Sequence, residues 1–188
     1  DARYGGVETY IRNLCFNLCK RGVRVTVLTS KTYPEDSFVE DFGNLKVLRG
    51  RVFCYVNGFP VYAFTRFSVL REAVREIRGA DIIHGHVNSP FTVEKALFYS
   101  EVFDKPFVVT YQADPLLRDS TQSSLKKLVA KAYSFSVLER ILRKADKIVA
   151  TTSLYPRRSV VLHRFVDKVV VIPCGVDTEK FKPSFKRS

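Results

Sequence analysis

Two of the three histidines, His84 and His86, lie two positions apart in an apolar segment. Side chains at that spacing on a β-strand point to the same face of its sheet, so the two imidazoles should stand side by side. Two imidazoles can bind a metal ion, but the sequence offers no third ligand at a suitable spacing. We therefore predict no metal site and interpret the pair as hydrogen-bonding groups that line the edge of a cleft. A purely structural role is the alternative.

Three more polar residues follow segments with the composition of buried strands. Gln112 and Asp114 follow residues 107–111, and Ser153 follows residues 147–151. Ligands of parallel α/β sheets bind where the carboxyl ends of the strands meet. We therefore expect these three side chains to line the same cleft as the imidazoles.

Gly5 and Gly6 precede the first predicted helix. Glycines in this position let a ligand approach the backbone, and the unpaired N–H groups at a helix N-terminus can bind a phosphate. The Gly-Gly pair alone is weak evidence for a phosphate site, because two glycines before a helix often form only a tight turn. The dinucleotide-binding pattern G-x-G-x-x-G is absent, which argues against an NAD-dependent dehydrogenase.

Helices and strands alternate along the chain. Apolar periodicity predicts helices at 7–21, 67–79, 91–103 and 123–144, with a short one after residue 151. Short apolar runs predict strands at 23–29, 81–87, 107–111, 147–151 and 168–172, and two further strands on either side of Gly50; residues 34–41 should form a loop. This alternation indicates an α/β class, a doubly wound, mostly parallel, Rossmann-like sheet with helices on both faces. A Rossmann unit begins with a strand, so we infer that the first strand is missing before Gly5.

Composition sets further limits. The chain carries a formal net charge of +12, and 46% of its residues are hydrophobic, which excludes a disordered chain. No apolar run reaches the roughly 18–20 residues needed to cross a bilayer. The four cysteines form no zinc-binding pattern, so we predict buried, reduced thiols. These features predict a cytoplasmic protein and leave open a peripheral position at the inner face of the membrane.

The predicted helix at 123–144 is basic. Its apolar residues form one predicted stripe: Leu125, Leu128, Ala132, Phe135, Leu138 and Leu142. Its cations could contact an anionic membrane, namely Lys126, Lys127, Lys131 and Arg140. The alternative is a helix that packs on the sheet and exposes its charges to solvent. A net charge of this size also attracts nucleic acid, but no nucleic-acid motif is present and the basic residues are spread along the chain.

Several ordered segments together resemble the N-terminal domain of glycosyltransferase family four. They are Gly5–Glu8, Arg21–Val27, Asp81–His86, Val109–Asp114, Ala145–Ser153 and Val171–Pro183. The resemblance implies one half of the GT-B architecture, with residues 1–172 as the acceptor domain and 173–188 as the hinge and the start of a C-terminal domain. It also implies a retaining glycosyltransferase (hexosyl- or similar) that uses a nucleotide sugar as substrate, without metal or other cofactor, to build a glycolipid, polysaccharide or other glycoconjugate.

The resemblance assigns roles to individual residues. Gly5 and Gly6 should face the donor diphosphate, and Glu8 and Asp114 should contact acceptor hydroxyls. Gln112 replaces the family's usual histidine, and an amide cannot transfer protons near neutral pH. Because the family's C-terminal domain grips the diphosphate, we expect residues 1–188 alone to be inactive. The other functions left open are a GT-B-like epimerase or phosphorylase and a basic, non-catalytic domain that binds nucleic acid or other anions.

Overall fold

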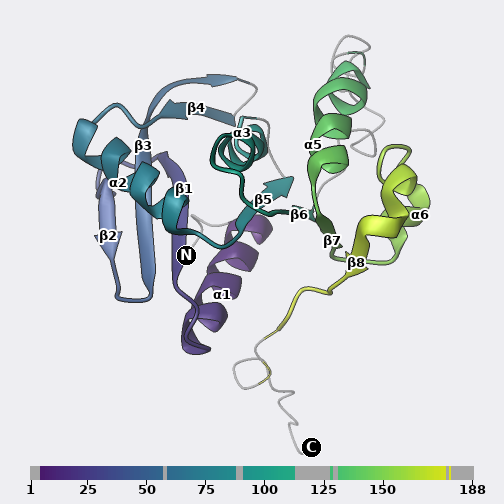
Figure 1. The fold of residues 1–188 in the computed structure, drawn as a ribbon, viewed down its shortest axis with the longest axis horizontal. Coiled ribbons are helices and arrows are strands. Elements are labelled where there is room, and N and C mark those ends of the chain that lie inside the picture. Colours follow the sequence, from purple (N-terminus) through teal and green to yellow (C-terminus); the bar gives the residue numbers. More distant parts are fainter. Residues whose placement is uncertain are drawn as a thin grey trace, which may run out of the picture.

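The computed structural model describes residues 5–56, 59–87, 91–112, 128, 131–176 and 178. Its helices are α1 (Gly6–Lys20), α2 (Phe67–Gly79), α3 (Val93–Phe103), α5 (Glu139–Lys144) and α6 (Leu154–Arg158), with a π-helical turn η1 (Ser134–Leu138) and a 3-10 segment η2 (Leu162–Lys168). Its strands are β1 (Val25–Lys31), β2 (Val39–Asp41), β3 (Leu45–Val56), β4 (Phe59–Ala63), β5 (Ile83–Val87), β6 (Phe107–Tyr111), β7 (Lys147–Ala150) and β8 (Val169–Val171). Figure 1 shows their arrangement.

One four-stranded sheet is entirely parallel. Its strands follow one another in the order β5-β6-β7-β8. The inner strand β6 is largely enclosed, since Phe107, Val109 and Tyr111 are at most 1% exposed. The predicted α/β class with parallel strands is therefore confirmed.

A second four-stranded sheet contains β1, β2, β3 and β4. β1 pairs in parallel with β3, whereas β2 and β4 run antiparallel to it. The predicted break at Gly50 is wrong, because β3 continues through this residue. A Cβ at Gly50 would lie 2.6 Å from Cδ2 of Tyr62, so the glycine marks the close approach of β4. β2 lies within the segment predicted as a loop, and β4 was not predicted.

The remaining predicted elements lie close to their expected places. α1 ends at Lys20, shortly before a glycine: Gly22 has a φ of 82°, and Val23 N donates to the carbonyl of Leu18. This left-handed geometry is the usual C-terminal stop of a helix, and glycine adopts it without strain. α2 spans the predicted residues, and β6 matches its predicted range.

The basic helix differs from its prediction in one respect. Residues 131–133, η1 and α5 form one continuous helix, here called helix 131–144. Leu138 and Leu142 are fully buried, but Leu128 is 64% and Phe135 is 40% exposed. The prediction of a single buried apolar stripe along this helix is therefore wrong. The π-helical turn inserts an extra residue, which rotates the residues before it relative to the buried face.

All four cysteines are free thiols, as predicted, but only Cys15 is buried; Cys54 and Cys174 are exposed. Among the described residues, no helix is both long and apolar enough to span a bilayer.

Candidate functional site

His84 and His86 stand side by side on β5. Their ring centroids are 4.4 Å apart, and the planes are inclined by only 27°, so the rings are stacked. Gly85 points to the other face of the sheet, where a Cβ would lie 3.0 Å from Cγ2 of Val93. Helix α3 therefore covers the face opposite the imidazoles, and the predicted pairing of the two histidines is confirmed.

Helix α1 lies on the imidazole face. The Tyr10 ring meets the His86 ring edge-on, with 6.1 Å between the centroids. The Tyr10 hydroxyl is hydrogen-bonded to the side chain of Thr110 on β6, and Cys174 lies close enough to raise the pKa of Tyr10 further beyond the effect of burial. The Thr110 hydroxyl also lies 2.7 Å from Nε2 of His84. A helix, two neighbouring strands and the segment after β8 thus meet at one polar cluster.

Tyr10 and Thr110 were not among the predicted site residues. Tyr10 lies beside the apolar face of α1, three positions after Val7, so its aromatic ring looked like part of the core. Thr110 lies inside a strand and is fully buried. Only the packing of α1 across β5 and β6 reveals their roles. One sequence signal was available: a tyrosine one turn after Gly5-Gly6 combines an apolar ring with a polar tip.

Gln112 joins the cluster from the end of β6. Its backbone N donates to the carbonyl of Val87, and its carbonyl accepts a hydrogen bond from the hydroxyl of Tyr155 at 2.9 Å. Its side chain lies beside His86 and acts to raise the pKa of that imidazole. Oε1 of Gln112 and Nδ1 of His86 are buried and have no hydrogen-bond partner among the described residues. Buried polar atoms are rarely left unpaired, so these two atoms mark a place for a polar ligand or an ordered water.

Both imidazoles are neutral near pH 7. Burial lowers the pKa of His84 to about 4. Burial, and then the proximity of His84, lowers the pKa of His86 to about 3, while the neighbouring amide of Gln112 opposes this shift. His84 keeps considerable contact with solvent and His86 is half-buried, so we expect the shift of His84 to be the smaller of the two. Neutral rings can hydrogen-bond a hydroxyl but supply no positive charge to a phosphate.

The glycine pair begins α1 as predicted. Gly5 is the N-cap and Gly6 is the first helical residue, and nothing lies within 4 Å of a Cβ built on Gly6. The Glu8 carboxylate folds back over the helix start, since its Oε2 lies 2.7 Å from the position of a Cβ on Gly5. A carboxylate is favourable there because of the helix dipole, but it lies where a phosphate would bind. A donor diphosphate would have to displace Glu8.

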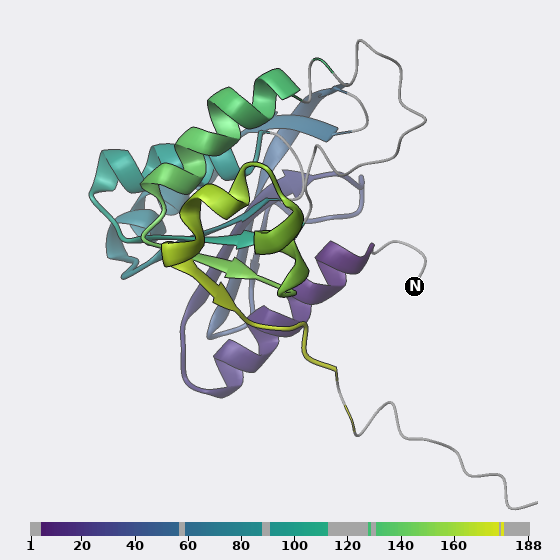
Figure 2. The same cartoon turned by 90° about the vertical axis from the view of Figure 1, so that its right-hand side faces the viewer.

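The strands of the parallel sheet point toward the side on which α1 begins (Figure 2). The glycine pair and Gln112 therefore share one end of the domain. Ser153 is exposed at the start of α6, directly after β7, and Tyr155 of the same helix reaches Gln112. Asp114, Lys126 and Lys127 lie outside the described residues.

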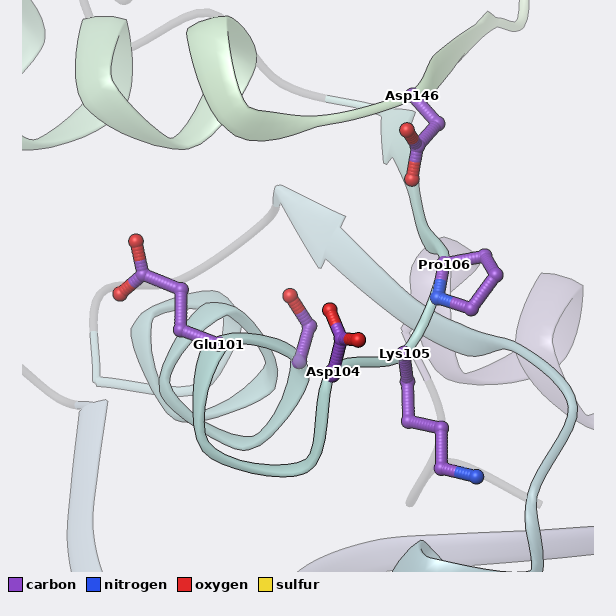
Figure 3. A pocket seen from close by; sticks show the side chains of 6 residues that line it. Glu101, Asp104, Lys105, Pro106 and Asp146 are labelled. Carbon is purple, nitrogen blue, oxygen red and sulfur yellow. The ribbon is translucent and has the colours of Figure 1, made fainter.

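A hollow lies at the opposite, amino-terminal end of the sheet (Figure 3). It is lined by Ser100, Glu101, Asp104, Lys105, Pro106 and Asp146. The Lys105 side chain points away from the carboxylates of Glu101, Asp104 and Asp146. Asp146 Oδ2 accepts a hydrogen bond from the backbone N of Phe107 at 2.7 Å, so this residue fixes the start of β6. Within the described ranges, no group of three or more His, Cys, Asp or Glu side chains could hold a metal ion.

Comparison with known proteins gives a consistent result. The chain is 31% identical over 186 residues to a D-rhamnosyltransferase of Pseudomonas aeruginosa, with 97% of this chain and 44% of the relative covered. It is 30% identical over 175 residues to the O-antigen chain mannosyltransferase C of Escherichia coli, with 93% of this chain and 43% of the relative covered. The chain thus spans less than half the length of these relatives.

The fold itself also has a solved counterpart. The sucrose-phosphate synthase of Thermosynechococcus elongatus superposes with a TM-score of 0.60 at 20% identity, covering 96% of this chain and 45% of that one. Residues 4–180 match the family model described as Glycosyltransferase Family 4. The chain therefore belongs to glycosyltransferase family 4.

Proposed function

We propose that the protein containing this chain transfers a sugar from a nucleotide-sugar donor to an acceptor hydroxyl, with retention at the anomeric carbon. Residues 1–172 would form the acceptor-side domain, and residues 173–188 the hinge to a second domain that holds the nucleotide. The match to the family over nearly the whole chain supports this, as do relatives described as rhamnosyl- and mannosyltransferases. By analogy with them, the product belongs to glycolipid or polysaccharide synthesis.

The cluster around His86 carries the proposal. Neutral imidazoles, an amide and two hydroxyls offer donors and acceptors of the kind that sugar hydroxyls need. The unpaired atoms His86 Nδ1 and Gln112 Oε1 provide one donor or acceptor each without breaking an existing hydrogen bond. We assign the acceptor, or the transferred sugar, to this cluster and the donor diphosphate to Gly5 and Gly6.

The proposal needs no metal and no tightly bound cofactor. A leaving diphosphate requires N–H donors and positive charge where its negative charge develops. The start of α1 supplies N–H groups, and the cations would come mainly from the second domain. None of the groups in the imidazole cluster is charged near neutral pH, so the cluster positions hydroxyls rather than stabilising the diphosphate.

Product analysis with the full-length protein tests the proposal. Incubation with nucleotide sugars and a lipid or saccharide acceptor should give a glycosylated acceptor with the anomeric configuration of the donor. An isomerised nucleotide sugar without any conjugate would instead identify an epimerase. Release of a sugar phosphate would identify a phosphorylase. Either of these two outcomes contradicts the proposal.

A further inference from the structure

Besides His86 and Gln112, one more residue has a buried polar atom without a hydrogen-bond partner in the described part of the chain. Glu94 lies in the first turn of α3, and its Oε1 accepts a hydrogen bond from the Tyr133 hydroxyl at 2.8 Å. Its Oε2 is buried and unpaired among the described residues. A buried carboxylate oxygen without a donor is costly. Oε2 of Glu94 therefore indicates a place for a donor from a ligand or an ordered water.

Glu94 lies at the same end of the parallel sheet as the imidazole cluster, but on the opposite face. α3 follows β5 and helix 131–144 precedes β7, so both helices run antiparallel to the strands, and residues early in each lie at the carboxyl end. The two helices lie beside each other (Figure 1), on the face toward which Gly85 points and away from His84 and His86. The ends of β5 and β6 separate the two places, so one sugar ring at the imidazoles would not reach Glu94.

The neighbouring cation does not satisfy Glu94. Nζ of Lys95 donates to the carbonyl of Tyr62 at 2.5 Å and lies 3.2 Å from the centroid of the Tyr62 ring. Burial lowers the pKa of Lys95 to about 8, and the charge of Glu94 opposes this shift. Lys95 is thus close enough to balance part of the charge of Glu94, but it is held by β4. Oε2 of Glu94 consequently suits a neutral donor better than a second cation.

Glu94 and Tyr133 together offer two hydrogen-bond acceptors. Oε2 of Glu94 can only accept, and the Tyr133 hydroxyl, which donates its proton to Oε1, can accept once more. Burial, and then the charge of Glu94, raises the pKa of Tyr133, so this hydroxyl keeps its proton. Two neighbouring acceptors match two neighbouring hydroxyl groups, which a sugar ring carries. A phosphate near neutral pH offers mainly acceptors, and the carboxylate would repel its charge.

We propose that Glu94 and Tyr133 bind two adjacent hydroxyls of a saccharide unit that neighbours the sugar at the imidazole cluster. This inference rests on the proposed sugar transfer and makes it more specific: the acceptor presents at least two sugar units, and the unit at Glu94 carries no negative charge. Glu94 as a residue is only partly buried, so a rotation of its side chain brings Oε2 to a ligand. Phe91, three positions before Glu94, has a φ of 72°, and strained backbone of this kind is concentrated at ligand-binding sites.

Binding of the full-length protein to an array of immobilised saccharides, without nucleotide sugar, tests this inference. The array carries mannose and rhamnose, singly and linked in pairs, in view of the relatives. The unchanged protein should bind at least one pair more tightly than its single units. Glu94→Gln replaces the charged acceptor by an amide of the same shape, so it should weaken binding of that pair about tenfold and leave binding of the single units unchanged. Tyr133→Phe should act in the same direction.

Two further variants serve as controls. Glu101→Gln makes the same substitution at an exposed position of the same helix, and it should leave the binding of pairs and of single units unchanged. His86→Leu should weaken the binding of both, because it alters the cluster that holds the first unit. Far-UV circular dichroism checks that each variant is folded, and Tyr133→Phe replaces Glu94→Gln if the latter is not.

The inference fails if the unchanged protein binds no pair more tightly than its single units, or if Glu94→Gln and Glu101→Gln have equal effects. It also fails if Glu94→Gln weakens the binding of single units as much as that of pairs. Product analysis with the unchanged protein tests sugar transfer separately. A glycosylated acceptor together with any of these array results contradicts only the role of Glu94, whereas an isomerised nucleotide sugar or a sugar phosphate contradicts the proposed function itself.

Discussion

The two ends of the parallel sheet differ in how they use polar side chains. At the amino-terminal end, Asp146 caps the backbone of Phe107, and Glu101 pairs with Arg140 and Lys144. At the carboxyl end, His86 Nδ1 and Gln112 Oε1 are buried and have no hydrogen-bond partner within the part of the chain that the structure describes. The polar groups at the amino-terminal end hold strands and helices in place. At the carboxyl end, these two atoms could bind a ligand. The side chains around the hollow in Figure 3 therefore serve the fold, and the imidazole cluster is the site for which we propose a function.

The largest expected effect comes from the carboxyl end. His86→Leu keeps a similar volume but removes the ring nitrogens, so kcat/KM of the full-length protein should fall about 10- to 100-fold, the cost of one or two hydrogen bonds to a buried ligand. The free energy of unfolding should hardly change, because Nδ1 has no hydrogen-bond partner to lose among the residues that the structure describes. Steady-state kinetics and urea unfolding measure the two quantities.

The third histidine supplies the matched control for this variant. His163 is exposed on η2, and its ring is hydrogen-bonded to the nearby carbonyl of Val160. His163→Ala should leave both kcat/KM and stability nearly unchanged. If His86→Leu reduced stability and activity in parallel, the carboxyl end would be structural as well, and the contrast between the two ends would fail.

The reverse pattern is expected at the amino-terminal end. Asp146→Ala removes the acceptor for the N–H of Phe107, which starts the most enclosed strand. The free energy of unfolding should fall by about 1–2 kcal/mol, with kcat/KM per folded molecule unchanged. Asp167→Ala, an exposed carboxylate on η2, serves as the comparison and should have a smaller effect on unfolding. A loss of activity in folded Asp146→Ala would place function at this end too.

Acidification should lower the free energy of unfolding through the two imidazoles at the carboxyl end. In the unfolded chain a histidine takes up a proton near pH 6.5, but burial lowers the pKa of His84 to about 4 and that of His86 to about 3 in the folded protein. Between these values only the unfolded state binds the protons. The contribution of neutral imidazoles to stability is therefore present above about pH 6.5 and is lost progressively as the pH falls toward 4.

Urea unfolding at a series of pH values measures this loss. The His86→Leu variant should lose less stability between pH 6.5 and pH 4 than the unchanged protein, since one of the two shifted groups is gone. The His163→Ala variant should follow the unchanged protein. Identical slopes for all three proteins would mean that the imidazoles of β5 are not shifted by burial.

Features that depend on neighbouring residues could be predicted from the sequence. β6 and α2 were predicted at their observed positions, because continuous apolar runs and helical periodicity are local signals. The pairing of His84 with His86 follows from the two-residue repeat of a strand and needs no tertiary information. These features depend only on neighbouring residues.

Features that depend on packing were missed. β4 and the continuity of β3 through Gly50 depend on antiparallel pairing, and the glycine that suggested a break permits that pairing. The π-helical turn η1 rotates the residues before it relative to those after it. A stripe predicted with a constant helical repeat therefore placed Phe135 on the buried face, although it is 40% exposed. Tyr10 and Thr110 meet only because α1 crosses β5 and β6.

The smallest expected effect concerns Gln112, where the family's usual residue is histidine. Gln112→Ala should lower kcat/KM about tenfold, because it removes the amide next to His86 and one hydrogen bond to a ligand. Gln112→His should change kcat/KM by less than this, since an imidazole can donate or accept in the same place. It should also add a titratable group to the cluster and so change the dependence of kcat/KM on pH in acidic solution, because an amide does not titrate whereas a histidine does. Full activity in Gln112→Ala would remove the amide from the carboxyl-end site and leave the two imidazoles as its functional groups.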